Sequence, residues 1–152
     1  MPTISRDAPL NEITLRRYEK PYDLKGRDLT KKFCLSLGLL QPADSRDIIV
    51  DILQVLIKAK KEKKLLTSEE IKELTVGERK NKNLPLKGIA SSNVRRQLKR
   101  LKDIFIVECI NNQYRITEFE DISILFEKKI EKFFIPMIIE RIKDYLNAMK
   151  EQ

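Results

Sequence analysis

The sequence has no histidine and no tryptophan, and of its 152 residues only 4 are glycine, 6 are proline and 2 are cysteine. Histidine is the commonest general base and metal ligand near neutral pH, so its absence argues against most acid–base enzymes and metal sites. The chain also lacks a glycine-rich phosphate loop and a nucleophile elbow. We therefore expect a protein that is not an enzyme and has no cofactor or metal. The sequence does not indicate whether it binds a small-molecule effector.

Long apolar runs are missing as well. No stretch of 18 apolar residues occurs, and the N-terminus lacks the apolar centre of a signal peptide. Cys34 and Cys109 lie far apart in the sequence and do not have metal-binding spacing, which favours two reduced cysteines of an intracellular protein. These features predict a cytoplasmic protein with no membrane partner.

Acidic residues are absent from one segment, and this local absence is the strongest signal in the sequence. Residues 79–102 hold nine of the 31 basic residues and none of the 23 acidic ones. The rest of the chain has 22 basic against 23 acidic residues, so the net charge of +8 arises entirely in this segment. Such a concentration is typical of a surface that binds a polyanion. The alternative interpretation is a well-solvated helix face.

The scarcity of glycine and proline favours a mainly helical chain. Apolar residues at helical spacing predict helices at 27–37 and at about 45–61. A capping box of Thr67 and Glu70, in which each side chain accepts a hydrogen bond from the other's backbone N–H, predicts the start of another helix.

The basic segment contains a further predicted helix at 91–102, which begins near two serines that are good N-cap residues. Its apolar stripe consists of Val94, Leu98 and Leu101. The opposite face carries almost only hydrogen-bond donors. Two β-rich stretches follow at 104–110 and 113–117, joined by Asn111-Asn112. Asparagine tolerates the positive φ that a two-residue turn requires, so these stretches predict a short hairpin.

The order of these elements, with "LTSEEIKELT", "SSNVRRQLKRLKD" and "IFIVECINNQYRIT" in sequence, resembles the winged helix-turn-helix superfamily, especially small archaeal and bacterial transcription-regulator domains. The resemblance implies a mainly α fold with a small β-hairpin, in which a winged helix-turn-helix core is flanked by N- and C-terminal helices. The resemblance covers about residues 45–117. Together with the helical patterns on either side, it divides the chain into an N-terminal arm and helix at 1–43, a winged helix DNA-binding domain at 44–117 and a C-terminal helical dimerisation segment at 118–152.

The resemblance also implies a function, that of a dimeric transcriptional regulator reading double-stranded DNA with helix 91–102 in the major groove. The residues expected to contact DNA are Ser91, Ser92, Asn93, Arg95, Arg96, Lys99, Arg100, Lys102 and Arg115. Among these, Arg96 is the first candidate for a base contact and Asn93 the second, whereas the other cations suit phosphates. Alternatives are a winged-helix protein-interaction module, a subunit of a larger assembly, or an RNA-binding protein.

A second helical pattern of apolar residues runs from 121 to 149, and Pro136 should kink or restart this helix. It has more apolar side chains than a small domain can cover, so we expect a homodimer. The expected interface consists of Phe133, Phe134, Met137, Ile138, Ile142 and Tyr145. The alternative is that the helix folds back and buries this pattern within one chain.

Overall fold

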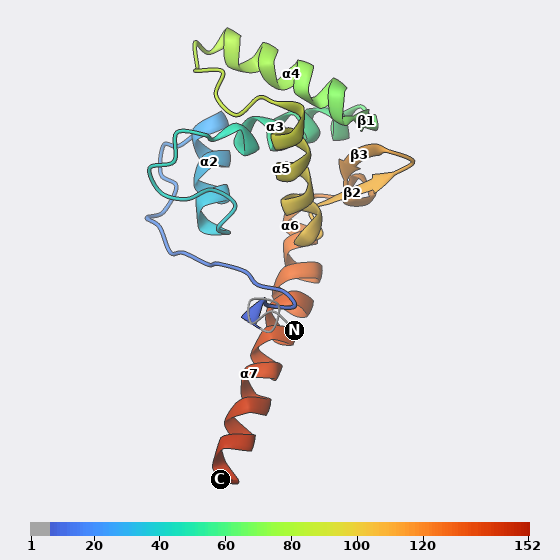
Figure 1. Ribbon diagram of the computed structural model, residues 1–152. Coiled ribbons are helices and arrows are strands. Elements are labelled where there is room, and N and C mark those ends of the chain that lie inside the picture. Colours follow the sequence, from blue (N-terminus) through green and yellow to red (C-terminus); the bar gives the residue numbers. More distant parts are fainter. Residues whose placement is uncertain (1–6) are drawn as a thin grey trace.

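The computed structural model describes residues 7–152, and its elements are labelled in Figure 1. The helices before the sheet hairpin are α2 (Gly26–Ser36), α3 (Ile48–Lys61), α4 (Ser68–Asn81) and α5 (Ser91–Asp103). The strands are β1 (Leu66–Thr67), β2 (Val107–Ile110) and β3 (Gln113–Ile116). A long C-terminal helix comprises α6 (Ile122–Leu125), a π-helical segment (Phe126–Phe134) and α7 (Ile135–Lys150). The described chain is therefore mainly helical with one small sheet, as predicted.

The sheet is antiparallel and has the strand order β1-β3-β2. β2 and β3 form the predicted hairpin, and its turn residues Asn111 and Asn112 have φ values of 50° and 63°, which confirms the predicted turn. β1 is only two residues long and pairs with β3 through Leu66 opposite Tyr114. The sequence does not indicate β1, because two residues are too few to show an alternating pattern.

The start of α4 is the predicted capping box. The N–H of Glu70 donates to the Thr67 hydroxyl at 3.2 Å, and the N–H of Thr67 donates to the Glu70 carboxylate at 2.9 Å. The start of α5 differs from the prediction, because its N-cap is Ala90 and no side chain caps the helix. Both serines therefore lie inside the first turn of α5, with their backbone N–H groups directed out of the helix end.

α3 lies at the centre of the core, and most of its residues are buried. The same core cluster extends from Cys34 and Leu37 at the end of α2 to Leu125 and Ile130 in the C-terminal helix. Side chains from all three predicted segments thus share one core. Burial raises the pKa of the Cys34 thiol to about 12, so this cysteine stays protonated at neutral pH.

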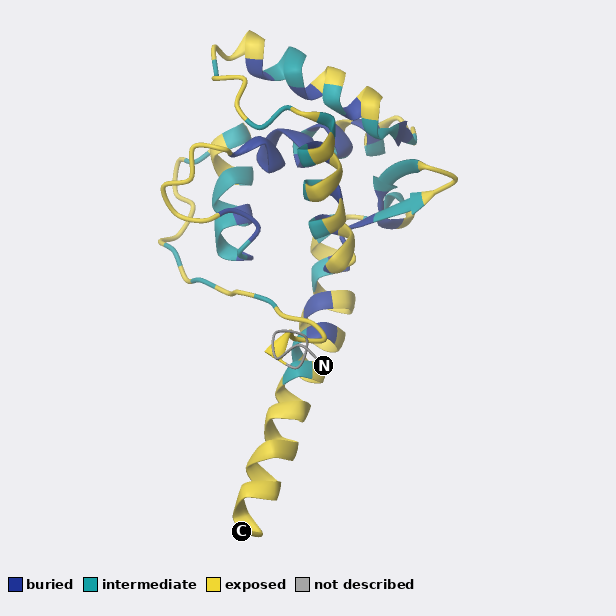
Figure 2. Cartoon of the chain, in the orientation of Figure 1, coloured by how far each residue is buried: buried dark blue, intermediate teal, exposed yellow. Residues whose placement is uncertain are grey.

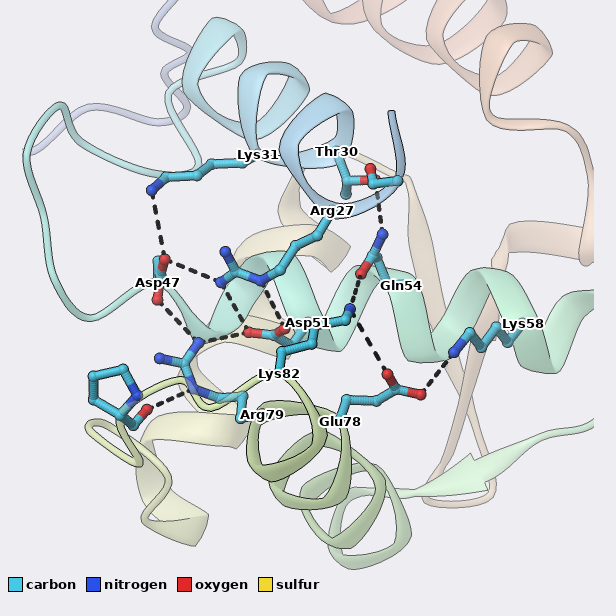
Figure 3. A network of polar contacts seen from close by, with 12 residues as sticks. Arg27, Thr30, Lys31, Asp47, Asp51, Gln54, Lys58, Glu78, Arg79 and Lys82 are labelled. Atoms are coloured by element: carbon cyan, nitrogen blue, oxygen red, sulfur yellow. Dashed lines mark hydrogen bonds and ion pairs between the residues drawn. The ribbon is translucent and has the colours of Figure 1, made fainter. Parts of the chain in front are cut away.

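A buried ion network connects α2, α3 and α4 (Figure 3). Arg79 donates to Asp47 at 2.9 Å, to Asp51 at 2.7 Å and to the carbonyl of Pro85 at 2.7 Å. Arg27 binds the same carboxylates, at 3.0 Å to Asp47 and 2.9 Å to Asp51. Asp47 is also the N-cap residue of α3, and its carboxylate is used by the two arginines and not by the helix end. The sequence predicts the start of this helix near residue 45, but α3 begins at Ile48.

The N-terminal arm crosses the end of α2 as an extended chain. The backbone N–H of Arg16 donates to the carbonyl of Ser36 at 2.8 Å, and its guanidinium donates to the carbonyls of Leu35 and Leu40. Gly38 has a φ of +69°, and a Cβ at this position would lie 2.5 Å from the Cβ of Thr14. A glycine is therefore required where the arm passes over the chain.

The C-terminal helix leaves the body of the protein and ends far from it (Figure 1). It does not stop at Pro136, but its geometry changes there. The N–H of Ile135 bonds to the carbonyl of Ile130, five residues back, and α-helical geometry resumes from Ile135. Proline has no N–H to give to the preceding turn, which accounts for the change. None of the residues of α7 is buried (Figure 2), and no helix in residues 7–152 is long and apolar enough to cross a membrane.

Candidate nucleic-acid interface

The two faces of α5 have opposite character. Val94, Leu98 and Leu101 are buried, as predicted. At about 100° per residue, the side facing away from them carries a continuous group of donors. This group, which we call the basic face, consists of Ser92, Arg95, Arg96, Lys99 and Lys102, and every member is exposed.

Three cations of the basic face have no internal partner. The side chains of Arg95, Arg96 and Lys102 make no hydrogen bond or ion pair with the residues that the structure describes (7–152). Arg95 lies towards the sheet, where burial raises the pKa of the Tyr114 phenol and the charge of Arg95 acts in the opposite direction. The basic face therefore extends from the helix towards β3 with its charges directed into solvent.

Lys99 is paired, but weakly. Its ammonium lies 3.0 Å from the carboxylate of Asp103, with side chains that are 73% and 58% exposed. An exposed pair one helical turn apart contributes only about 0.3–0.5 kcal/mol. A phosphate that approaches Lys99 can replace Asp103 at little cost.

A chain of hydrogen bonds along one flank of α5 uses two of the predicted DNA contacts internally. Asn93 donates to the carbonyl of Gly88 at 2.7 Å and accepts from Gln97 at 3.1 Å. Arg100 donates to Gln97 at 3.0 Å and to the carbonyl of Gly38 at 2.9 Å. These bonds tie α5 to the connection before it and to the loop after α2. Asn93 and Arg100 therefore hold the helix in place.

Arg115 is likewise held inside the protein. Its Nε lies 2.7 Å from the carboxylate of Glu108, and its guanidinium lies 4.7 Å from the centre of the Phe119 ring. The same Glu108 oxygen accepts from the N–H of Glu118. The hairpin tip at Asn111 and Asn112 has no cation of its own, so the hairpin offers an anion little attraction.

The N-terminus of α5 brings a further cation to the basic face. Lys72, from α4, donates to the Ser91 hydroxyl at 3.2 Å. Ser91 is half-buried and Ser92 is exposed. The positive end of the helix dipole, the serine hydroxyls and one ammonium group therefore meet at this point. Lys72 is not among the residues predicted to contact DNA, because nothing in the sequence shows that it lies beside a residue 19 positions later.

The predicted dimer residues fall into two groups. Phe133, Met137, Ile142 and Tyr145 are exposed at 51%, 36%, 54% and 69%, and Ile138 is half-buried. Phe134 was predicted to join them, but it is only 3% exposed and packs edge-on against Phe105. Four residues before it, Ile130 is also buried, so the wide π-helical turn directs both side chains into the body of the protein.

Comparison of the chain with protein-family models, curated proteins and solved structures found no match.

Proposed function

We propose that this protein is a winged helix protein that binds duplex DNA with the basic face of α5 and acts as a transcriptional regulator. Two features support the fold. The elements occur in the order helix, strand, helix, helix, hairpin, and β1 pairs with the second strand of the hairpin. Counted from α3, α5 then corresponds to the third helix of the motif, which in winged helix proteins enters the major groove.

The single observation that carries the function is the set of exposed cations on α5 that have no internal partner or, in the case of Lys99, only the weak exposed pair with Asp103. Lys99, Lys102 and Arg95 are suited to phosphates on both sides of a groove. Arg96 is exposed and can present its planar fork to the O6 and N7 atoms of guanine. Lys72, Ser91 and the first N–H groups of α5 can hold one more phosphate at the helix end.

The dependence of DNA affinity on salt tests this proposal. About four phosphates neutralised per protomer give a slope of log K against log salt of about −3 to −4. The triple change Arg95→Ala, Lys99→Ala and Lys102→Ala should weaken binding to all sequences and flatten this slope by about 2 to 3. Fluorescence anisotropy with a labelled 20-base-pair duplex measures both quantities.

A matched control removes the same charge elsewhere. Lys129→Ala, Lys143→Ala and Lys150→Ala change exposed lysines of the C-terminal helix, and the slope should remain nearly unchanged. Equal losses in the two triple variants would mean that only net charge attracts DNA and that α5 is not the interface. Arg96→Ala should reduce the preference for particular base pairs by about 1–3 kcal/mol each. Tighter binding to duplex RNA than to duplex DNA would replace DNA by RNA as the ligand.

A further inference from the structure

α7 carries an apolar stripe along its whole length. At 100° per residue, the stripe covers about 120° of the helix surface. It consists of Ile135, Ile138, Ile139, Ile142, Tyr145, Leu146 and Met149. The exposed fractions reach 54% for Ile142, 69% for Tyr145 and 70% for Met149. A stripe of this width is typical of a helix that packs against a partner, since such surfaces are rarely left exposed.

The described part of the same chain does not cover this stripe. Residues 8–11 pass beside α7, but a gap of about 500 Å³ separates them from Ile138, Ile142 and Tyr145. Leu10 is the large apolar residue of this segment, and it is 90% exposed, so it does not pack on the stripe. Figure 2 shows the distal part of α7 exposed on all sides. Within residues 7–152, the stripe is therefore left without a cover.

The apolar area of the stripe is sufficient for a dimer. Five side chains of the stripe are about half exposed or more, namely those of Ile139, Ile142, Tyr145, Leu146 and Met149. A half-exposed side chain of this size contributes on the order of 100 Å² to the surface, so covering these five removes about 500 Å² per stripe from water. Two stripes give about 1,000 Å² of apolar area, and an interface that is about 65% apolar then totals about 1,500 Å². This total lies within the usual range of stable protein–protein interfaces, about 1,200–2,000 Å².

The charge of α7 favours a second copy as the partner. Residues 135–152 have three basic and three acidic residues, namely Arg141, Lys143, Lys150, Glu140, Asp144 and Glu151. A helix with no net charge does not repel its own copy, whereas the strongly basic α5 would. An amphipathic helix that lies on a membrane is usually rich in Lys and Arg on its polar face, and α7 is not.

We infer that α7 is a homodimerisation helix, whose stripe packs against the stripe of a second copy of this chain. If α5 binds DNA as proposed above, the second copy supplies a second basic face. Two faces that bind together gain affinity from the high effective concentration of the second face after the first has bound. The dimer itself does not depend on that proposal, because the stripe and the basic face share no residue.

Sedimentation equilibrium on the full chain between 1 and 100 μM, without DNA, tests the inference. We expect a dimer for the unchanged protein. Ile142→Glu places a charge at the centre of the stripe and should weaken the dimer at least 100-fold. Asn147→Glu introduces the same side chain on the opposite side of α7 and should leave the dimer intact. Both positions are exposed, so neither change should affect folding, which circular dichroism verifies.

Three outcomes would overturn the inference. The first is a monomeric unchanged protein at 100 μM. The second is a dimer that resists Ile142→Glu, since the interface would then lie elsewhere. The third is a monomer that binds vesicles of anionic lipid through the stripe, which would make α7 a membrane-surface helix. DNA binding is measured separately, so a monomer that still binds duplex DNA through α5 would contradict the dimer and leave the proposed function standing.

Discussion

Arg79 is the residue whose removal should destabilise this protein most. It is 1% exposed, and it provides one of the two cations that neutralise Asp47 and Asp51. Arg79→Met retains the apolar stem of the side chain, but Arg27 is then the one largely buried cation among residues 7–152 that still pairs with Asp47 and Asp51. Breaking a buried ion network by removing one partner typically costs about 3–5 kcal/mol, because one negative charge of the network is then buried without a cation to neutralise it.

This cost is large compared with the total stability of a domain, which is usually about 5–15 kcal/mol. For a chain of this length, 1 kcal/mol shifts the midpoint of thermal unfolding by about 2–4 °C, so the midpoint of Arg79→Met should fall by roughly 10 °C. Urea unfolding followed by circular dichroism gives the free energy directly. The control is Arg17→Met, which changes an exposed arginine with no partner in residues 7–152 and should cost less than about 0.5 kcal/mol.

The pH dependence provides a second test of the same explanation. Burial alone would raise the pKa of Asp47, but the hydrogen bonds and charges of Arg27 and Arg79 outweigh it and hold this pKa below its ordinary value of 3.8. A carboxyl with a lowered pKa stabilises the folded state above its unfolded pKa, and this contribution is lost as the pH falls through the folded pKa. The unchanged protein should therefore lose stability below about pH 4.

In Arg79→Met, the pKa of Asp47 should rise, because one of its cations is gone. Protonation then relieves the uncompensated charge, so the stability difference between variant and unchanged protein should become smaller from pH 7 towards pH 4. Adding Asp51→Asn to Arg79→Met should recover part of the loss at pH 7, since it restores the charge balance. If Arg79→Met unfolds like Arg17→Met at pH 7, the network is not what fixes α2, α3 and α4 together.

Two smaller predictions concern the ends and flank of the motif helices. Thr67→Ala removes the hydroxyl that accepts from Glu70 and should lower the free energy of unfolding by about 1 kcal/mol, whereas Ser68→Ala, one residue later, should cost much less in the same urea titration. Arg100→Ala removes the bonds to Gly38 and Gln97 and should lower the free energy of unfolding by about 1–2 kcal/mol. The slope of log K for DNA against log salt should stay the same within about 0.5, whereas a slope that flattens by about 1 would assign Arg100 to a phosphate instead.

The sequence predicts correctly those structural features whose contacts join residues close together in the chain. The capping box of Thr67 and Glu70 involves residues three positions apart, and the turn at Asn111 needs only a residue that tolerates positive φ. The buried stripe of α5 follows from one helical period. β1 could not be found in this way, because its pairing with β3 joins residues separated by nearly 50 positions.

The contrast between contacts of neighbouring residues and contacts of distant residues also explains which predicted DNA-binding residues of α5 have free side chains. Sequence spacing identifies the residues that face away from the buried stripe, and Arg95, Arg96 and Lys102 are indeed exposed. It cannot show that the loop after α2 brings the carbonyl of Gly38 to within 2.9 Å of Arg100. A cation count from sequence alone therefore overestimates the number of cations on α5 that are free to bind a phosphate. Because the internal bonds fix one flank of α5, its free cations project from a rigid helix, and less conformational entropy is lost when they bind.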